Sequence, residues 1–373
     1  MIAPNTLLAL VTDAFGGKGG IAQYNRDLFN ASVESGSVSS ILVIPRLAPN
    51  HADTPTPIRQ TVPRSGRAAY VVGAMRRAMS NPIDTVFCGH IFMAPLAMLI
   101  ARLKGAKLIM QMHGIEGWQR PSPLTRKAVE TADLVICVSR HTRAAVLKWA
   151  VIAPERVIVL PNTIGDAFTP GDGAALRTEL GLAGKRILLT VARMAASERY
   201  KGHDRVIAAM PQLIALGHDL AYVIVGEGDD RKRLEDLVSA AALTNRVRFL
   251  GALEPRQLVD AYRMADLFVM PSSGEGFGIA FLEAMASGTP ALGLGVAGAR
   301  DALADGELGT CLSDETELVA AITRLLAQPK PDASALAAAV RARFGHDTFC
   351  SNVKAAFQKL LGPPSNSADL IAE

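Results

Sequence analysis

The chain has 373 residues, and at roughly 150 residues per domain this length predicts two domains. Hydrophobic residues make up 49% and charged residues 20%, a balance that is typical of a globular protein and excludes wholesale disorder. The net charge of +4 conceals a basic half and an acidic half: residues 1–165 hold 18 Lys/Arg against 9 Asp/Glu, and residues 166–373 hold 21 against 26.

Short apolar runs alternate with longer amphipathic stretches, a pattern that predicts an α/β protein with parallel sheets and crossover helices in both halves. Residues 1–13 lack the features of a signal peptide, so we interpret them as a first strand and expect a cytoplasmic protein. The expected strands of the first half are 7–11, 40–44, 85–88, 107–112, 134–138 and 157–160. Those of the second half are 187–192, 221–225, 247–250, 267–270 and 291–294.

Turn-forming residues place a linker at about 161–173, and we expect a cleft between the two halves. The longest apolar run, 91–101, has about half of the ~20 residues that a spanning helix needs, so we expect no transmembrane segment. After Pro363 the tail is small and polar, and we expect it to be frayed.

The basic first half predicts an acidic partner surface. An apolar run at 68–75 precedes Arg76 and Arg77, a pattern that fits anionic lipid headgroups, although solvated helix faces explain the same cations equally well. Aromatic residues are only 5% of the chain, so we do not expect a nucleic-acid partner. The four cysteines are far apart and form no Cys-x-x-Cys pair, which predicts reduced thiols rather than disulfides or a metal-cysteine site.

In parallel α/β sheets, ligands bind beyond the carboxyl ends of the strands, so the residues that follow each strand are the candidates for chemistry. After the first strand come Gly16, Gly17, Gly19 and Gly20, whose backbone amides suit a phosphate or a sugar hydroxyl. Their spacing matches neither a dinucleotide fingerprint nor a Walker loop, and a plain flexible turn is the alternative.

His113 closes the expected strand 107–112. A pKa near neutrality would let it exchange a proton with a sugar hydroxyl or form a hydrogen bond to one, and a purely structural histidine is the alternative.

In the second half, Arg193 follows a strand and Lys201 lies in the segment 197–204, which we expect to open a helix. A guanidinium and an ammonium group near a helix start suit a pyrophosphate that gains negative charge as it leaves. Gly226 and Glu227 follow the next strand and indicate either a nucleotide-binding turn or a helix-capping turn.

The segment 271–290 reads as a strand end, a glycine-rich loop, a helix at 279–287 and a Gly-x-Pro stop. Glu275 lies in the loop, where it can accept hydrogen bonds from sugar hydroxyls, and the amides of the loop can bind negative oxygens. The residues that carry these amides are Gly276, Phe277, Gly278 and Ile279. Glu283 lies among apolar residues of the helix, so we expect it to be poorly solvated and to need partners such as ribose hydroxyls.

These segments resemble the GT-B glycosyltransferases, particularly the retaining family 4 enzymes that assemble bacterial polysaccharides and glycolipids. Glu275-x7-Glu283 resembles the Glu-x7-Glu motif of that family, and Arg193 with Lys201-Gly resembles its diphosphate-binding pair. The resemblance also covers the first glycine loop, the cleft histidine His113 and the turn at Gly226.

The resemblance implies two Rossmann-like domains: an acceptor-side domain, residues 1–165, and a donor-binding domain, residues 166–343. It also implies that the C-terminal helix, at about 344–373, packs on the acceptor-side domain. It further implies transfer of a sugar from a UDP- or GDP-linked donor to an acceptor hydroxyl with retention of configuration. We expect a lipid-linked glycan or glycolipid acceptor, peripheral contact with the inner face of the cytoplasmic membrane, no cofactor and no metal, since the sequence has no Asp-x-Asp pair.

Two other functions remain open at this point. One is an epimerase or hydrolase of nucleotide sugars with the same two-domain fold. The other is an inert nucleotide-sugar-binding scaffold.

Overall fold

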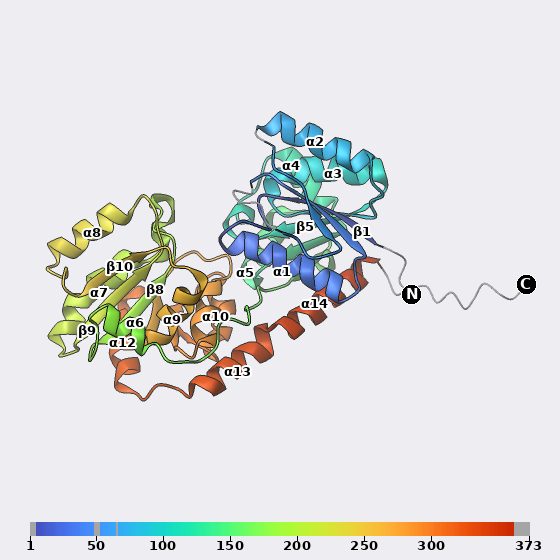
Figure 1. Cartoon of the computed structure of the whole chain (residues 1–373). Coiled ribbons are helices and arrows are strands. Elements are labelled where there is room, and N and C mark those ends of the chain that lie inside the picture. Colours follow the sequence, from blue (N-terminus) through green and yellow to red (C-terminus); the bar gives the residue numbers. More distant parts are fainter. Residues whose placement is uncertain (1–4, 48–52, 65, 362–373) are drawn as a thin grey trace, which may run out of the picture. The chain divides into compact units, whose positions relative to one another are not determined.

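The computed structural model describes residues 5–47, 53–64 and 66–361. The chain divides into two compact units: unit 1 is Met1–Thr163 with His346–Glu373, and unit 2 is Ile164–Gly345. Each unit is a parallel sheet with helices packed on it (Figure 1). The described helices include none that is both long enough and apolar enough to span a membrane.

The sheet of unit 1 has seven parallel strands in the order β3-β2-β1-β4-β5-β6-β7. The strands are β1 (Thr6–Val11), β2 (Ser40–Pro45), β3 (Ile58–Gln60), β4 (Thr85–Cys88), β5 (Lys107–Met112), β6 (Leu134–Cys137) and β7 (Val157–Val159). The helices are α1 (Gly20–Glu34), α2 (Arg67–Met79), α3 (Ala94–Lys104), α4 (Pro123–Glu130), α5 (Arg140–Trp149) and α14 (His346–Leu361), with short 3₁₀ turns at Ile91–Met93, Ile115–Gly117 and Pro154–Arg156.

The inner strands of unit 1 are continuous apolar runs because helices cover both faces of the sheet. Residues of α2, α3 and α4 form one core with the sheet. On α1, Phe29 packs edge-on against Phe87 of β4, with ring centroids 5.5 Å apart. The helix α14 packs beside α1, where Tyr24 and Phe349 bring their ring centroids within 6.0 Å.

The sheet of unit 2 has six parallel strands in the order β10-β9-β8-β11-β12-β13. They are β8 (Arg186–Val191), β9 (Leu220–Val225), β10 (Val247–Gly251), β11 (Leu267–Met270), β12 (Ala291–Leu294) and β13 (Thr310–Leu312). The helices are α6 (Ala174–Glu179), α7 (His203–Ala215), α8 (Arg231–Ala240), α9 (Pro255–Met264), α10 (Ile279–Ala286), α11 (Ala299–Ala302), α12 (Leu318–Ala327) and α13 (Ala333–Phe344), with 3₁₀ turns η4 (Ala196–Lys201), Ala304–Gly306 and Glu315–Glu317.

The core of unit 2 lies between the sheet and the helices α7, α8 and α12. Local signals set the helix limits: α9 begins at Pro255 behind a reciprocal capping box between Glu254 and Gln257. On α10, Phe281 packs edge-on against Phe268 of β11, with centroids 5.5 Å apart. This contact ties the start of α10 to the strand that precedes it.

All eleven strands expected from the sequence are confirmed to within two residues at each end. The sequence pattern missed β3 and β13, whose three residues, Ile-Arg-Gln and Thr-Cys-Leu, form no continuous apolar run, unlike Val-Ile-Val of the equally short edge strand β7. The expectation of a frayed tail after Pro363 lies outside the described residues. All four thiols are free, with Cys88 and Cys137 buried and the other two partly exposed.

Candidate active site

The strand order of unit 2 creates the place where a site is expected. Strands β8 and β11 are neighbours, and the chain runs outward from them in opposite directions, to β9 on one side and to β12 on the other. The loops that leave such a pair at its carboxyl ends diverge and leave a crevice above the sheet. Here these loops are 192–202 after β8 and 271–278 after β11. They contain Arg193, Lys201 and Glu275.

Backbone contacts hold these two loops together. The amide of Ser273 donates to the carbonyl of Tyr200 over 2.9 Å. Gly202 has φ 82°, and a Cβ there would lie 2.7 Å from the carbonyl oxygen of Pro271. Only glycine combines this backbone conformation with so close an approach. The sequence Lys201-Gly202 therefore sets the position of the lysine against the loop that carries Glu275.

Lys201 and Glu275 form an ion pair. The ammonium Nζ donates to Oε1 over 2.8 Å and to Oε2 over 2.9 Å. The side chains are only 17% and 6% exposed. Few waters screen this pair, so its hydrogen bonds are stronger than those of a surface pair. The sequence placed both residues at the candidate site, but it did not indicate that they bind each other.

Arg193 is the more accessible cation, with a side chain that is 77% exposed and paired with Glu198. Tyr200 lies among the charges of this site: burial raises its pKa, the carboxylates of Glu198 and Glu275 raise it further, and Arg193 opposes them. Its ring centroid is 5.5 Å from the ammonium of Lys201. Arg193, Lys201 and Glu275 thus gather around Tyr200, a residue to which the sequence analysis gave no role.

The glycine-rich loop after β11 mixes exposed and buried positions. Phe277 is 4% exposed, and its ring packs edge-on against Phe344 at 5.7 Å between centroids. Its side chain therefore belongs to the core, and only its backbone is suited to bind a ligand. Gly278 adopts φ 97° directly before α10, which begins at Ile279, while Gly276 is partly buried in the same loop.

Glu283 is buried on α10, as expected, but its partner is a protein group. The hydroxyl of Tyr262 on α9 donates to Oε2 of Glu283 over 2.6 Å. Burial raises the pKa of Glu283 to about 7, although the hydrogen bond from Tyr262 opposes the shift. Near neutral pH this carboxyl group is thus part neutral acid and part carboxylate. No local pattern around Glu283 points to Tyr262, because Tyr262 lies on a different helix, α9.

The turn after β9 has a packing reason for its glycines. A Cβ on Gly226 would lie 2.1 Å from the carbonyl oxygen of Ala192, and one on Gly228 would lie 2.0 Å from that of Met194. The carbonyl of Glu227 accepts a hydrogen bond from the amide of Met194 over 2.8 Å. Contact with the protein's own chain after β8 therefore explains these glycines without a nucleotide.

In unit 1, side chains of neighbouring residues hold the glycine loop in place. Arg26 donates to the carbonyl oxygen of Gly17 over 2.9 Å, and a Cβ on Gly17 would overlap the carboxylate of Asp13. Gly16 and Gly19 have φ 82° and 94°, respectively. The last glycines, Gly19 and Gly20, are exposed and have open space around them. The loop is therefore ordered by its neighbours rather than a loose turn.

His113 lies at the carboxyl end of β5 and next to the start of α1, where Tyr24 packs edge-on against its ring at 5.3 Å. Burial lowers the pKa of His113 to about 4. The expected pKa near neutrality is therefore wrong. The neutral ring donates from Nε2 to the carbonyl of Gly89 over 3.0 Å, which leaves Nδ1 as its acceptor. Proton exchange near pH 7 is not supported, whereas acceptance of a hydrogen bond stays a prediction.

The structure thus brings the predicted residues together in two groups. Arg193, Lys201 and Glu275 meet in unit 2, while His113 and the glycine loop share the carboxyl edge of the sheet in unit 1. Sequence reasoning missed Glu116, which accepts hydrogen bonds from the amides of His113 and Gly114. The spacing of three residues after His113 was the only signal for it.

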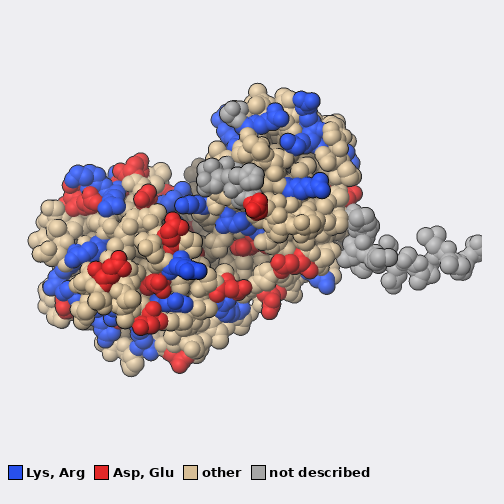
Figure 2. Space-filling model, viewed as in Figure 1, with Lys and Arg blue, Asp and Glu red and all other residues tan. Residues whose placement is uncertain are grey.

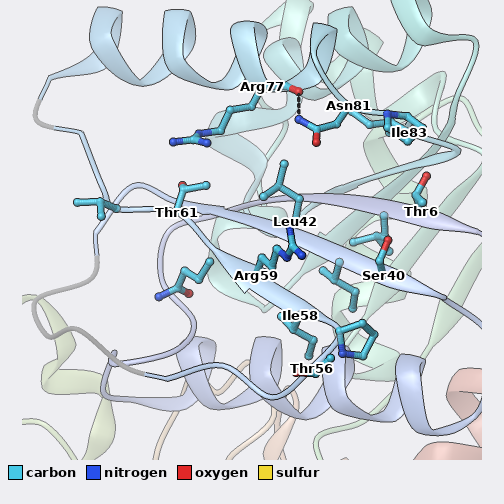
Figure 3. Close-up of a pocket in the computed structure, with 16 residues that line it drawn as sticks. Thr6, Ser40, Leu42, Thr56, Ile58, Arg59, Thr61, Arg77, Asn81 and Ile83 are labelled. Atoms are coloured by element: carbon cyan, nitrogen blue, oxygen red, sulfur yellow. Dashed lines mark hydrogen bonds between the residues drawn. The ribbon is translucent and has the colours of Figure 1, made fainter.

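A second region of unit 1 is a basic hollow of about 790 Å³ beside α2. Arg59 of β3 and Arg77 of α2 line it, together with Ser40, Thr61 and Asn81 (Figure 3). Among the described residues, neither guanidinium has a carboxylate partner. Lys and Arg side chains gather over this part of unit 1 in Figure 2.

Comparison with known proteins places the chain in a family. The family model for glycosyl transferases group 1 matches residues 174–343, and the model for glycosyltransferase family 4 matches residues 18–167. The GDP-mannose-dependent alpha-(1-6)-phosphatidylinositol monomannoside mannosyltransferase of Mycolicibacterium smegmatis is 32% identical over 282 residues, which cover 70% of this chain and 72% of that protein. The alpha-D-kanosaminyltransferase of Streptomyces kanamyceticus is 31% identical over 62% of this chain and 64% of its own length.

Solved structures show the same fold. The sucrose-phosphate synthase of Thermosynechococcus elongatus matches with a TM-score of 0.77 and 23% identity, over 96% of this chain and 99% of that chain. The Anabaena protein HepE, solved with UDP-glucose, matches with a TM-score of 0.76 and 20% identity, over 95% and 99%. From these family matches and this fold, we conclude that the chain belongs to family 4 of the glycosyltransferases, the glycosyl transferases group 1, and is a glycosyltransferase with the GT-B fold.

Proposed function

We propose that the protein transfers a sugar from a UDP- or GDP-linked donor to an acceptor hydroxyl with retention of the anomeric configuration and without a metal ion. The observation that carries the proposal is the Lys201–Glu275 pair beside Arg193, in the loops that follow the neighbouring strands β8 and β11 of unit 2. The names of the relatives support the donor class, since one uses GDP-mannose and one structure holds UDP-glucose.

The leaving group explains why cations gather there. Breaking the bond between the anomeric carbon and the phosphate oxygen moves negative charge onto the diphosphate, and Lys201 and Arg193 supply positive charge to stabilise it. Glu275 holds the ammonium group of Lys201 in place and offers its oxygens to sugar hydroxyls. Glu283 would accept from a ribose hydroxyl, and Nδ1 of His113 from a hydroxyl of the sugar or acceptor. We assign no covalent nucleophile, and the acceptor attacks from the face that the diphosphate leaves.

Release of nucleotide from a panel of UDP- and GDP-sugars tests the proposal. The acceptors should include phosphatidylinositol monomannoside, which appears in the name of a relative, and a lipid-linked glycan. Nucleotide release that requires an acceptor supports transfer, and an α-configured product from an α-linked donor supports retention. Release without an acceptor indicates an epimerase or hydrolase, and donor binding without turnover indicates a scaffold. Added Mg²⁺ or Mn²⁺ should not raise the turnover of the EDTA-treated enzyme.

We also propose that the acceptor is presented at an anionic membrane surface, which would be the inner face of the cytoplasmic membrane. The α2 surface, as we call the exposed residues on and around α2, combines arginines with apolar side chains. Its arginines are Arg59, Arg64, Arg67, Arg76 and Arg77, and its apolar residues are Val62, Val71, Val72 and Met79. Each cation near an anionic bilayer adds about 1 kcal/mol of attraction, and the apolar side chains can enter the headgroup region.

Flotation with vesicles that contain anionic lipid tests this surface. We expect binding at low salt that weakens at high salt, and weaker binding of Arg76→Glu than of the wild type. Arg256→Glu, at an exposed position on α9 of unit 2, is the matched control and should bind as the wild type does. Absence of binding at low salt would remove the electrostatic argument without affecting the assignment of sugar transfer.

A further inference from the structure

Three potential metal ligands converge where α1 ends against α14. Glu34 is the last residue of α1, and His346 and Cys350 lie one turn apart on α14. The three ligand atoms lie within 4.8 Å of one another, and all belong to unit 1. Glu34 and His346 are 312 residues apart in the chain, so no local motif such as Cys-x-x-Cys could indicate this site.

The contacts distinguish a metal site from a catalytic relay. Nε2 of His346 lies 2.6 Å from Oε2 of Glu34 and 3.4 Å from Sγ of Cys350. A nucleophile relay needs the two ring nitrogens on different partners, with one facing the thiol and the other facing the acid. Here one nitrogen faces both groups, and Sγ is also 3.7 Å from the same carboxylate oxygen. The three ligand atoms therefore lie close to one another around a common point.

The separations suit a tetrahedral ion. Bonds of about 2.0 Å to oxygen and nitrogen and about 2.3 Å to sulfur place ligand atoms about 3.3–3.6 Å apart. The pairs that include sulfur, at 3.4 and 3.7 Å, are already near this range, and the nitrogen–oxygen pair must open by about 0.7 Å. Glu34 and His346 keep half-exposed side chains, so an ion can enter and a water can complete the coordination.

We propose that Glu34, His346 and Cys350 bind one Zn²⁺ ion that fastens the C-terminal helix to α1. Thiolate, imidazole and carboxylate together favour Zn²⁺ or Co²⁺ over Mg²⁺ and Ca²⁺, which prefer sites made of oxygens. The thiol gives up its proton as the metal–sulfur bond forms, so binding releases a proton from Cys350. The three ligands meet only in the folded chain, so binding of the ion stabilises the folded state over the unfolded one. The site lies at the opposite end of α1 from the glycine loop and is separate from sugar transfer.

Cobalt titration of the tag-free, EDTA-treated full chain tests the site. We expect one equivalent of Co²⁺ to produce a thiolate-to-cobalt charge-transfer band and Zn²⁺ to displace it. Cys350→Ser should abolish the band, and Cys311→Ser, which removes another partly exposed thiol, should keep it. His346→Ala and Glu34→Gln should weaken Zn²⁺ binding about tenfold or more, because loss of a ligand costs at least as much as loss of its supporting groups.

Thermal unfolding gives a second readout that does not depend on enzymatic activity. One equivalent of Zn²⁺ should raise the melting temperature of the wild type and of Cys311→Ser, and should leave that of Cys350→Ser unchanged. Absence of the cobalt band in the wild type would overturn the proposal. A band that persists in Cys350→Ser, or that disappears in Cys311→Ser, would also overturn it.

Discussion

Replacement of the buried acid Glu283 by glutamine should change how the stability of unit 2 depends on pH. Burial raises the pKa of Glu283 from 4.5 to about 7, so the folded protein holds this proton more tightly than the unfolded chain does. Stability from this group is therefore fully present below pH 4.5 and is lost as the pH rises through 7. At 1.36 kcal/mol per pKa unit, a difference of about 2.5 units corresponds to about 3 kcal/mol.

Glu283→Gln removes the ionisation but keeps an oxygen that can accept from the hydroxyl of Tyr262. Relative to the wild type, the variant should therefore gain up to about 3 kcal/mol between pH 5 and pH 8. Urea unfolding at several pH values measures the difference. Both tryptophans, Trp118 and Trp149, lie in unit 1, so a transition seen by circular dichroism but not by tryptophan fluorescence reports unit 2.

Glu179→Gln, at an exposed position on α6, is the matched control and should show a constant difference from the wild type across this range. A difference between Glu283→Gln and the wild type that is equally constant from pH 5 to pH 8 would refute the reasoning. It would mean that Glu283 ionises in the folded protein much as it does in the unfolded chain.

Three further predictions concern the loops and His113. Lys201→Ala should lower kcat by roughly two to three orders of magnitude, as loss of a transition-state donor does. Lys232→Ala, on the exposed face of α8, is the control and should not change kcat. Equal turnover in both variants would contradict the role of Lys201. Gly202→Ala should cost more stability and activity than Gly217→Ala, since both positions have φ near 80–90° but only Gly202 would press its Cβ on Pro271. The left-handed conformation alone costs about 1–2 kcal/mol, so equal losses would show that the contact with Pro271 is unimportant. An NMR titration of the His113 imidazole should give a midpoint near pH 4. Because the pKa is lowered in the folded protein, the contribution of His113 to stability is present above pH 6.5 and is lost as the pH falls toward 4. A midpoint near 6.5 would contradict the loss of hydration around the ring.

Much of the fold is visible in the amino-acid sequence because parallel strands covered on both faces must be apolar throughout. The runs at 107–112, 267–270 and 291–294 coincide with β5, β11 and β12. The edge strands β3 and β13 do not show this pattern because polar residues, Arg59 and Gln60 in β3 and Thr310 in β13, interrupt their short apolar stretches. The rule that sites follow strand ends also selected the segments that carry Lys201, Glu275 and His113.

The groups that contact these residues could not be predicted from the local sequence. Local composition shows that Glu283 is in apolar surroundings, but not that Tyr262 reaches it from another helix. It suggests a titratable histidine at the end of β5, but the loss of hydration around its ring lowers the pKa of His113 to about 4. It shows two cations for a diphosphate, but not that carboxylates already pair with both.

The difference between what the sequence predicts and what it does not has a physical origin. Hydrophobic periodicity, glycine turns and helix stops act between neighbours along the chain, so the sequence alone determined the order of elements, the two parallel sheets and the family. Ionisation and ligand geometry depend on groups that are close in space and distant in sequence. Only the tertiary structure could therefore decide that Lys201 binds Glu275, that burial raises the pKa of Glu283, and that Cys350 lies beside Glu34 and His346.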